Sequence, residues 1–295
     1  MGAKILYYLV LIPLSRMPFF MLYALSDFAF FMIYYIVGYR KKVVFKNLKN
    51  SFPSKDEKEL KFLEKQFFKH LCDLMVESVK GFTISEKQIL KRVTFKNNEV
   101  LDQFFDQGKS VIVVTGHYNN WEMVGTASGK GIKHQPLGIY KPLSNKFFDK
   151  KMRVSRERHG LIMVPMKETI DSLKKDYGRP SALLFAADQT PSNVSKCYWM
   201  MFLNQETPVF FGPEKIAKDF DLPVVYSSMY KKKRGYYDVV HQVITEEPKE
   251  SGYGEITQKH VKILEEDIQL APQFWLWSHK RWKRERPDDM PLHCS

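Results

Sequence analysis

Residues 111–122 read VIVVTGHYNNWE, a stretch that joins a buried strand to the start of a helix. Its first five residues are short and rich in β-branched side chains, which is typical of a strand covered on both faces. In open α/β sheets, ligands bind beyond the carboxyl ends of such strands, and His117 stands there. Asn119 or Asn120 can cap the helix that follows, which puts Glu122 in its first turn.

His117 and Glu122 are five positions apart, or about 140° around a continuous helix, so they would not share a helix face. The chain changes from loop to helix between them, which lets the imidazole fold back towards the carboxylate. A carboxylate bonded to one ring nitrogen fixes the tautomer and raises the basicity of the other nitrogen. This is the orienting half of a catalytic triad, with the nucleophile left to a substrate hydroxyl. The alternative is a helix-start carboxylate beside an unrelated loop histidine.

Helix and strand patterns alternate through the rest of the chain. Apolar residues at helical spacing predict a helix over residues 58–80. Further helices are predicted at 145–158, within 208–220 and at 254–270, and further strands at 137–140, 181–187, 224–230 and 236–244, the last two as a hairpin. This alternation predicts an α/β fold with a mostly parallel central sheet flanked by helices.

The N-terminal segment is apolar, because residues 5–39 contain only two charged side chains, Arg16 and Asp27. It is longer than the roughly 20 residues that a spanning helix needs, and Pro13 and Pro18 bend it or split it into two helices. No signal-peptide cleavage site is evident. Three arrangements stay open: a single tilted span, a re-entrant or interfacial hairpin, and a pair of core helices in a soluble protein.

We divide the chain into a membrane anchor, residues 1–45, and a catalytic domain, residues 46–295. Four basic residues follow the apolar segment: Arg40, Lys41, Lys42 and Lys46. Positive residues beside a span stay cytoplasmic. We therefore expect the catalytic domain to face the cytoplasm.

Composition and motifs restrict the function. The chain has 295 residues and a net charge of +13, which attracts nucleic acid, an anionic membrane or an acidic partner. No zinc-finger spacing or RNA-binding signature accompanies this charge, so we expect no nucleic-acid partner. Cys72, Cys197 and Cys294 lie far apart, which argues against disulfides and thiolate-bound metal. Nucleophile-elbow and glycine-rich phosphate motifs are also missing, and we predict neither a metal nor a cofactor.

HYNNWE resembles the HxxxxE form of the HxxxxD/E motif in the bacterial lipid A late acyltransferases, the lauroyl/myristoyl acyltransferase family. Further segments resemble that family's blocks in the same order: Tyr140-Lys141-Pro142 with residues 153–160, Asp188-Gln189, residues 207–218 and residues 275–287. One departure is Asn119, where the family usually has glycine. Asparagine tolerates positive φ well, so we expect the turn to be kept.

The resemblance implies a glycerol-3-phosphate acyltransferase-like fold and a place in lipopolysaccharide biosynthesis at the bacterial inner membrane. It implies transfer of an acyl group from acyl carrier protein to a hydroxyl of an acyl chain on a lipid A precursor. We predict that His117 is the general base and that Glu122 orients it. The residues predicted to bind the oxyanion or the substrate are Arg156, Arg158, Asp188, Gln189 and Asn120.

Other interpretations stay open at this stage. The basic runs 231–234 and 280–286 are candidates for steering the acidic carrier protein or the anionic lipid, or are simply solvated surface. Three tryptophans near the C-terminus, Trp275, Trp277 and Trp282, are core residues or interfacial anchors. Acylation of a glycerophospholipid or an aminolipid is the alternative reaction, and a membrane-anchored scaffold is the alternative without catalysis.

Overall fold

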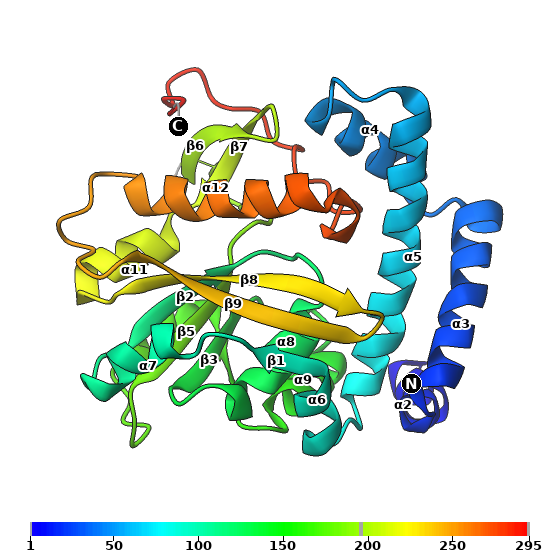
Figure 1. Ribbon diagram of the computed structural model, residues 1–295, viewed down its shortest axis with the longest axis horizontal. Coiled ribbons are helices and arrows are strands. Elements are labelled where there is room, and N and C mark those ends of the chain that lie inside the picture. The colour runs from blue at the N-terminus through cyan, green and yellow to red at the C-terminus, as the bar shows by residue number, and fades with distance from the viewer. Residues whose placement is uncertain (1, 195–196, 294–295) are drawn as a thin grey trace.

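A seven-stranded sheet forms the centre of the computed structural model, which describes residues 2–194 and 197–293 (Figure 1). The strands, in spatial order, are β1 (Val93–Phe95), β9 (Tyr236–Thr245), β8 (Val224–Lys233), β2 (Val111–Thr115), β5 (Ser181–Ala186), β3 (Gln135–Tyr140) and β4 (Ile162–Pro165). The five strands from β8 to β4 pair in parallel, whereas β9 runs antiparallel to β8 and parallel to β1. The predicted α/β fold with a mostly parallel sheet is confirmed.

Helices cover both faces of this sheet. One face packs against α6 (Glu86–Arg92), α7 (Glu99–Asp106) and α8 (Trp121–Gly131), with α9 (Lys146–Glu157) beside α8 and β4. The other face packs against α11 (Gly212–Phe220) and α12 (Glu255–Leu270). Short turns complete this part of the chain: η3 (Met166–Glu168), α10 (Thr169–Leu173) and η5 (Pro272–Phe274). The sheet is therefore buried on both sides, as its β-branched strands require.

A two-stranded hairpin, β6 (Cys197–Phe202) and β7 (Gln205–Phe210), lies above α12 in Figure 1. Its turn residues Leu203 and Asn204 both have positive φ, which matches the twist of a tight hairpin. Sequence patterns did not predict this hairpin. Of the three tryptophans near the C-terminus, Trp275 and Trp277 are buried in the core and Trp282 is partly buried against it.

The long helix α5 (Glu57–Gly81) stands across the end of the sheet and begins with a capping box formed by Asp56 and Glu59. It confirms the helix predicted at 58–80. The preceding helix α4 (Lys41–Ser51) runs without a break through residue 45, where we placed the boundary between anchor and catalytic domain. That division stays a prediction. Cys72 on α5 and Cys197 on β6 are buried and free, and Cys294 lies outside the described residues.

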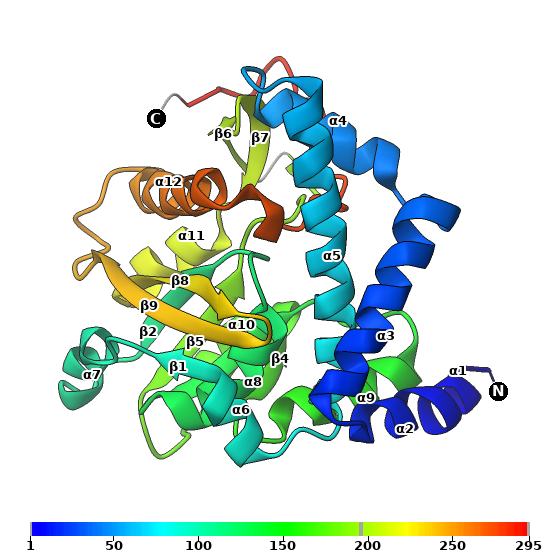
Figure 2. The ribbon, with the colours of Figure 1, turned by 45° about the vertical axis from the view of Figure 1, so that its right-hand side comes forward.

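The N-terminal segment folds as two helical rods. The first consists of α1 (Gly2–Ile5), the π-helical stretch η1 (Leu6–Leu11) and α2 (Ile12–Arg16); the second consists of α3 (Phe19–Phe31) and the π-helical stretch η2 (Met32–Val37). Pro18 separates the rods, whereas Pro13 is accommodated at the start of α2. Figure 2 shows the first rod beside α9 and the second along α5. Residues 19–37 are long and apolar enough to cross a membrane, judged by length and composition.

Candidate active site

Strand register brings His117 and Asp188 together. Thr115, the last residue of β2, pairs with Ala186, the last residue of the adjacent strand β5. His117 and Asp188 each lie two residues beyond these strand ends. Because the two strands are parallel neighbours, both side chains emerge at the same edge of the sheet.

The turn that carries His117 is closely packed. A side chain at Gly116 would place its Cβ 2.6 Å from the end of the Leu264 side chain on α12, so any larger residue there would force Leu264 to shift. Asn119 adopts a φ of 52°, which confirms the expected turn. Its amide donates to the carbonyl of Met229 at 2.6 Å and fixes the loop against β8.

Asn120 caps helix α8, as predicted for one of the two asparagines. Its Oδ1 accepts from the backbone N–H of Met123 at 2.9 Å, and its Nδ2 donates to the buried carboxylate of Glu77. The side chain is 1% exposed and does not line the cavity described below. Both ends of its side-chain amide are used inside the protein, so the structure does not support the predicted binding of substrate or the oxyanion by Asn120, which stays a prediction.

Asp188 holds His117 through both of its carboxylate oxygens. Oδ1 lies 2.6 Å from the His117 Nδ1 atom, and Oδ2 accepts from the His117 backbone N–H at 2.9 Å and from Nε1 of Trp275 at 2.7 Å. Burial on its own would raise the pKa of Asp188, but the imidazole charge and these hydrogen bonds outweigh it and hold the pKa at about 2. Asp188 is thus a buried carboxylate that stays ionised.

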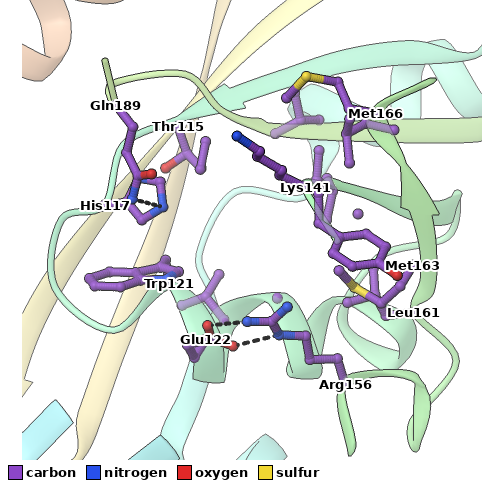
Figure 3. Close-up of a pocket in the computed structure, with 18 of the residues that line it drawn as sticks. Thr115, His117, Trp121, Glu122, Lys141, Arg156, Leu161, Met163, Met166 and Gln189 are labelled. Carbon is purple, nitrogen blue, oxygen red and sulfur yellow. Dashed lines mark hydrogen bonds and ion pairs between the residues drawn. The ribbon is translucent and has the colours of Figure 1, made fainter. Parts of the chain in front are cut away.

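The ionised carboxylate fixes the state of the imidazole. A carboxylate only accepts hydrogen bonds, so Nδ1 of His117 carries a proton in either state of the ring, and in the neutral imidazole Nε2 presents its lone pair. Nε2 lies 3.1 Å from the side-chain amide of Gln189 (Figure 3). The ring of Trp121 packs against the imidazole at a centroid distance of 4.9 Å. His117 is therefore oriented, partly covered and basic at one defined atom.

Glu122 has a different partner from the one predicted. Its carboxylate pairs with the guanidinium of Arg156 on α9, with Nε to Oε2 at 2.8 Å and Nη2 to Oε1 at 2.5 Å (Figure 3). The expected orientation of His117 by Glu122 is therefore corrected, because α8 directs Glu122 towards α9 while Asp188 occupies the Nδ1 side of the imidazole. Glu122 and Arg156 still face the same cavity as His117.

Arg158 lies outside the site. It follows the last helical residue of α9, and its Nη2 donates to the carbonyl of Phe82 at 2.6 Å. It is absent from the residues that line the cavity. Arg158 therefore points away from the cavity, whereas Arg156, two residues earlier, lines it. The position of Arg158 does not support the predicted role in binding the oxyanion or the substrate, which stays a prediction.

Comparison with known proteins identifies the family. Residues 2–284 match the family described as bacterial lipid A biosynthesis acyltransferase. The chain belongs to this acyltransferase family. It is 22% identical over 261 residues to the lipid A biosynthesis palmitoleoyltransferase of Escherichia coli (strain K12), covering 86% of this chain and 82% of the relative. It is 21% identical over 255 residues to the lipid A biosynthesis lauroyltransferase of the same strain, covering 85% and 81%.

Family membership confirms the resemblance drawn from the HxxxxE motif and its ordered blocks. The protein is an acyltransferase of lipid A biosynthesis, so the scaffold interpretation without catalysis is set aside. The family also implies an acyl donor and a lipid A precursor as the two substrates.

The acyltransferase has a cavity of about 1080 Å³ beside His117, between the sheet and helices α8 and α9. Alternate strand residues point into it, among them Thr115, Leu184, Gly138, Met163, Ser227 and His241. Small side chains in this set and on α8 leave the space that larger ones would fill. A cavity of this size matches the upper range of small-molecule sites, and its walls are largely apolar.

Basic side chains outnumber acidic ones around this cavity. Among the residues that the structure describes, five cationic ones line it: Lys141, Arg156, Lys167, Lys283 and Arg284. Three acidic ones do so: Glu122, Asp149 and Glu168. The excess of two positive charges favours an anionic substrate group at this surface.

The two basic runs are used differently from each other. Lys231 and Arg234 bind the buried Asp73 at 3.3 and 2.6 Å, so neither is a free steering charge. In the second run Arg281 is buried, with its Nη2 on the carbonyl of Pro208. Lys283 and Arg284 of the second run line the cavity, where they can meet a substrate.

Three site residues were not predicted in these roles. Trp121 covers the imidazole, Trp275 binds the orienting carboxylate, and Lys141 extends into the cavity (Figure 3). Lys141 follows β3 directly, so its position beyond a strand end was a usable signal. Trp275 carried no such signal, because its partner Asp188 is 87 residues away in the sequence, whereas Trp121 lies only four residues from the imidazole that it covers.

Proposed function

We propose that this acyltransferase moves a fatty acyl chain from an acyl carrier protein thioester to a hydroxyl of an acyl chain on a lipid A precursor. The observation that carries the proposal is the His117–Asp188 pair, which presents a basic Nε2 atom beside a large apolar cavity with a cationic rim. A base without a protein nucleophile suits transfer to a substrate hydroxyl.

In the proposed reaction, Nε2 of His117 takes the proton of the acceptor hydroxyl as its oxygen attacks the thioester carbonyl. The new C–O bond forms as the carbonyl oxygen becomes an oxyanion. When this intermediate collapses, the C–S bond breaks, and the thiolate of the carrier receives the proton from His117. Asp188 stays ionised throughout and stabilises the imidazolium. A positioned base of this kind contributes ~10²–10⁴-fold in rate.

The oxyanion needs donors near His117. The Gln189 amide lies beside the imidazole, and Arg156 lines the cavity with its charge held in place by Glu122. Burial lowers the pKa of Arg156, but the Glu122 charge outweighs that effect and raises it, so the guanidinium stays charged. We assign Gln189 and Arg156 to the oxyanion or to a substrate phosphate, and Glu122 to positioning Arg156.

The rest of the cavity suits the two substrates. Its apolar floor accommodates hydrocarbon, and its cationic rim attracts the phosphates of a lipid A precursor or the acidic carrier protein. The N-terminal rod adjoins this region, because Tyr7 packs against Phe147 of α9 at 5.6 Å. We propose a location at the bacterial inner membrane with the catalytic domain in the cytoplasm, where the donor resides.

The test is acyl transfer by membranes that contain the protein, with an under-acylated lipid A precursor and a series of acyl carrier protein thioesters. Products are weighed by mass spectrometry. We expect a gain of one acyl chain that disappears in His117→Ala, with Cys72→Ala, a substitution at a buried position outside the site, as the control. If only a glycerophospholipid or an aminolipid gains the chain, the acceptor assignment fails while the acyltransferase chemistry stands. Near-normal turnover by His117→Ala would refute the mechanism.

A further inference from the structure

The apolar rod formed by α3 and η2, residues 19–37, is bound to the catalytic domain at both of its ends. Three side-chain hydrogen bonds join it to α5: Tyr23 to Glu77 at 2.8 Å, Ser26 to Asp73 at 2.8 Å and Tyr34 to Glu64 at 3.3 Å. Figures 1 and 2 show the rod lying along α5 in both views. The rod therefore does not project away from the catalytic domain.

Further contacts hold both N-terminal rods in place. Arg234, at the tip of the β8–β9 hairpin, binds Asp27 of the rod at 2.7 Å and the buried Asp73 at 2.6 Å. In the first rod, the Ser15 carbonyl accepts from Lys80 at 3.0 Å and from Thr83 at 2.6 Å. Both helical rods are thus fastened to one rigid surface.

These attachments are incompatible with a rod that crosses a bilayer. The α5 residues bonded to it, from Glu64 to Glu77, span a rise of roughly 20 Å, so α5 would have to enter the hydrocarbon core as well. Lys69 of α5 lies 5.7 Å from the Phe30 ring, near the middle of the rod. A crossing would place this charge near the bilayer centre, where charged side chains are costly and rare.

The outward side of the rod nevertheless requires an apolar environment. Phe20, Phe28, Phe31 and Tyr35 repeat along one side and are 73, 61, 52 and 55% exposed. The first rod adds Leu9, which is 71% exposed. A helix that faces water on this side would be polar there. An exposed apolar surface of this extent marks contact with a membrane or a partner protein.

Cationic side chains border this apolar surface and favour a lipid headgroup layer over a protein. Lys41 lies 3.9 Å from the Tyr34 ring and Lys65 lies 5.8 Å from the Tyr35 ring. Residues 28–55 contain six lysines and arginines and no aspartate or glutamate. Apolar side chains beside such a run match an anionic leaflet, which attracts the cations while its acyl region accepts the aromatic rings.

The geometry points to in-plane binding of the N-terminal rods at a membrane surface. The two rods, residues 2–37, lie along the surface of one anionic phospholipid leaflet, insert the outward face of Phe20, Phe28, Phe31 and Tyr35, and cross the bilayer nowhere. The catalytic domain and the N-terminus then lie on the same side of the membrane. This inference is independent of the reaction that the active site performs.

The first experiment compares two cysteine probes in the full-length protein after the three native cysteines are replaced by serine. Lys4→Cys reports the N-terminal rod, and Glu250→Cys reports an exposed loop of the catalytic domain; both positions are exposed. Inside-out and right-side-out membrane vesicles are treated with a membrane-impermeant maleimide. We expect both probes to react in the same vesicle type. Reaction of Lys4→Cys only in the opposite type would show a crossing and overturn the inference.

The second experiment measures depth. Phe20→Cys, Phe28→Cys and Tyr35→Cys variants carry an environment-sensitive fluorophore and are reconstituted in vesicles with one-third anionic lipid. Spin-labelled lipids quench at shallow or deep positions. We expect all three probes to be quenched mainly by the shallow label. A deep position for the Phe28 probe with shallow flanking probes would indicate a span. No quenching at all would indicate no membrane contact. Either result would refute in-plane membrane binding.

Discussion

Replacing Asp188 with asparagine tests the reasoning about the active site most directly. The carboxylate accepts three hydrogen bonds, one through Oδ1 from His117 Nδ1 and two through Oδ2 from the His117 backbone and Trp275. An asparagine oxygen in the Oδ2 position keeps the two N–H donors and turns the NH₂ group towards Nδ1. The imidazole must then present its lone pair at Nδ1 and carry its proton on Nε2, where it cannot act as a base.

The opposite orientation of the amide does not rescue the site, because its NH₂ group would face two N–H donors. We therefore expect Asp188→Asn to keep the fold and lose ~10⁴-fold in kcat, the effect of a wrong tautomer in a Ser-His-Asp triad. That loss corresponds to about 5 kcal/mol of transition-state stabilisation. The assay is acyl transfer followed by mass spectrometry at saturating donor and acceptor, with circular dichroism to verify folding.

Glu122→Gln is the matched comparison, since it makes the same carboxylate-to-amide change in the same cavity. The structure predicts a much smaller effect, because Glu122 contacts Arg156 and not the imidazole. Near-normal turnover by Asp188→Asn would refute the tautomer argument. A loss in Glu122→Gln as large as in Asp188→Asn would return the orienting role to Glu122.

Three further predictions follow from the same structure. Glu122→Gln should raise KM for the anionic substrate or lower kcat about tenfold, because Arg156 loses the partner that fixes its position. Steady-state kinetics measures both constants. Gly116→Ala should destabilise the protein by about 1–3 kcal/mol, because the added methyl group overpacks against Leu264 of α12. Urea unfolding in detergent measures this change, and an unchanged midpoint would contradict the close packing at Gly116. Burial lowers the pKa of both His241 and His260 to about 4 from an ordinary 6.5, so the unfolded chain binds more protons between these values. The histidine contribution to the free energy of unfolding should be fully present above about pH 6.5 and should fall by about 2 kcal/mol for each histidine when the pH drops to 5. Equal free energies of unfolding at pH 7 and pH 5 would show that these side chains are already protonated or hydrated in the folded protein.

Local patterns in the sequence determined much of the architecture. The β-branched run before His117 forms β2 at the predicted residues, and helical spacing placed α5 within one residue at each end. Asn120 became the cap of α8, and Pro18 separated the two N-terminal rods. Each of these features depends on residues within a few positions of one another, so the sequence alone contains the physical cause.

The tertiary structure decided which side chains meet. His117 and Asp188 are 71 residues apart, and both simply follow strands; they become partners because β2 and β5 are adjacent, parallel and in a register that aligns their last residues. Glu122, only five residues from His117, is turned away by its helix towards Arg156. The same holds for the N-terminal rod, whose composition allows a span. Its attachment to buried carboxylates of α5 arises only when distant segments pack together. We infer from this attachment that the rod does not span the membrane.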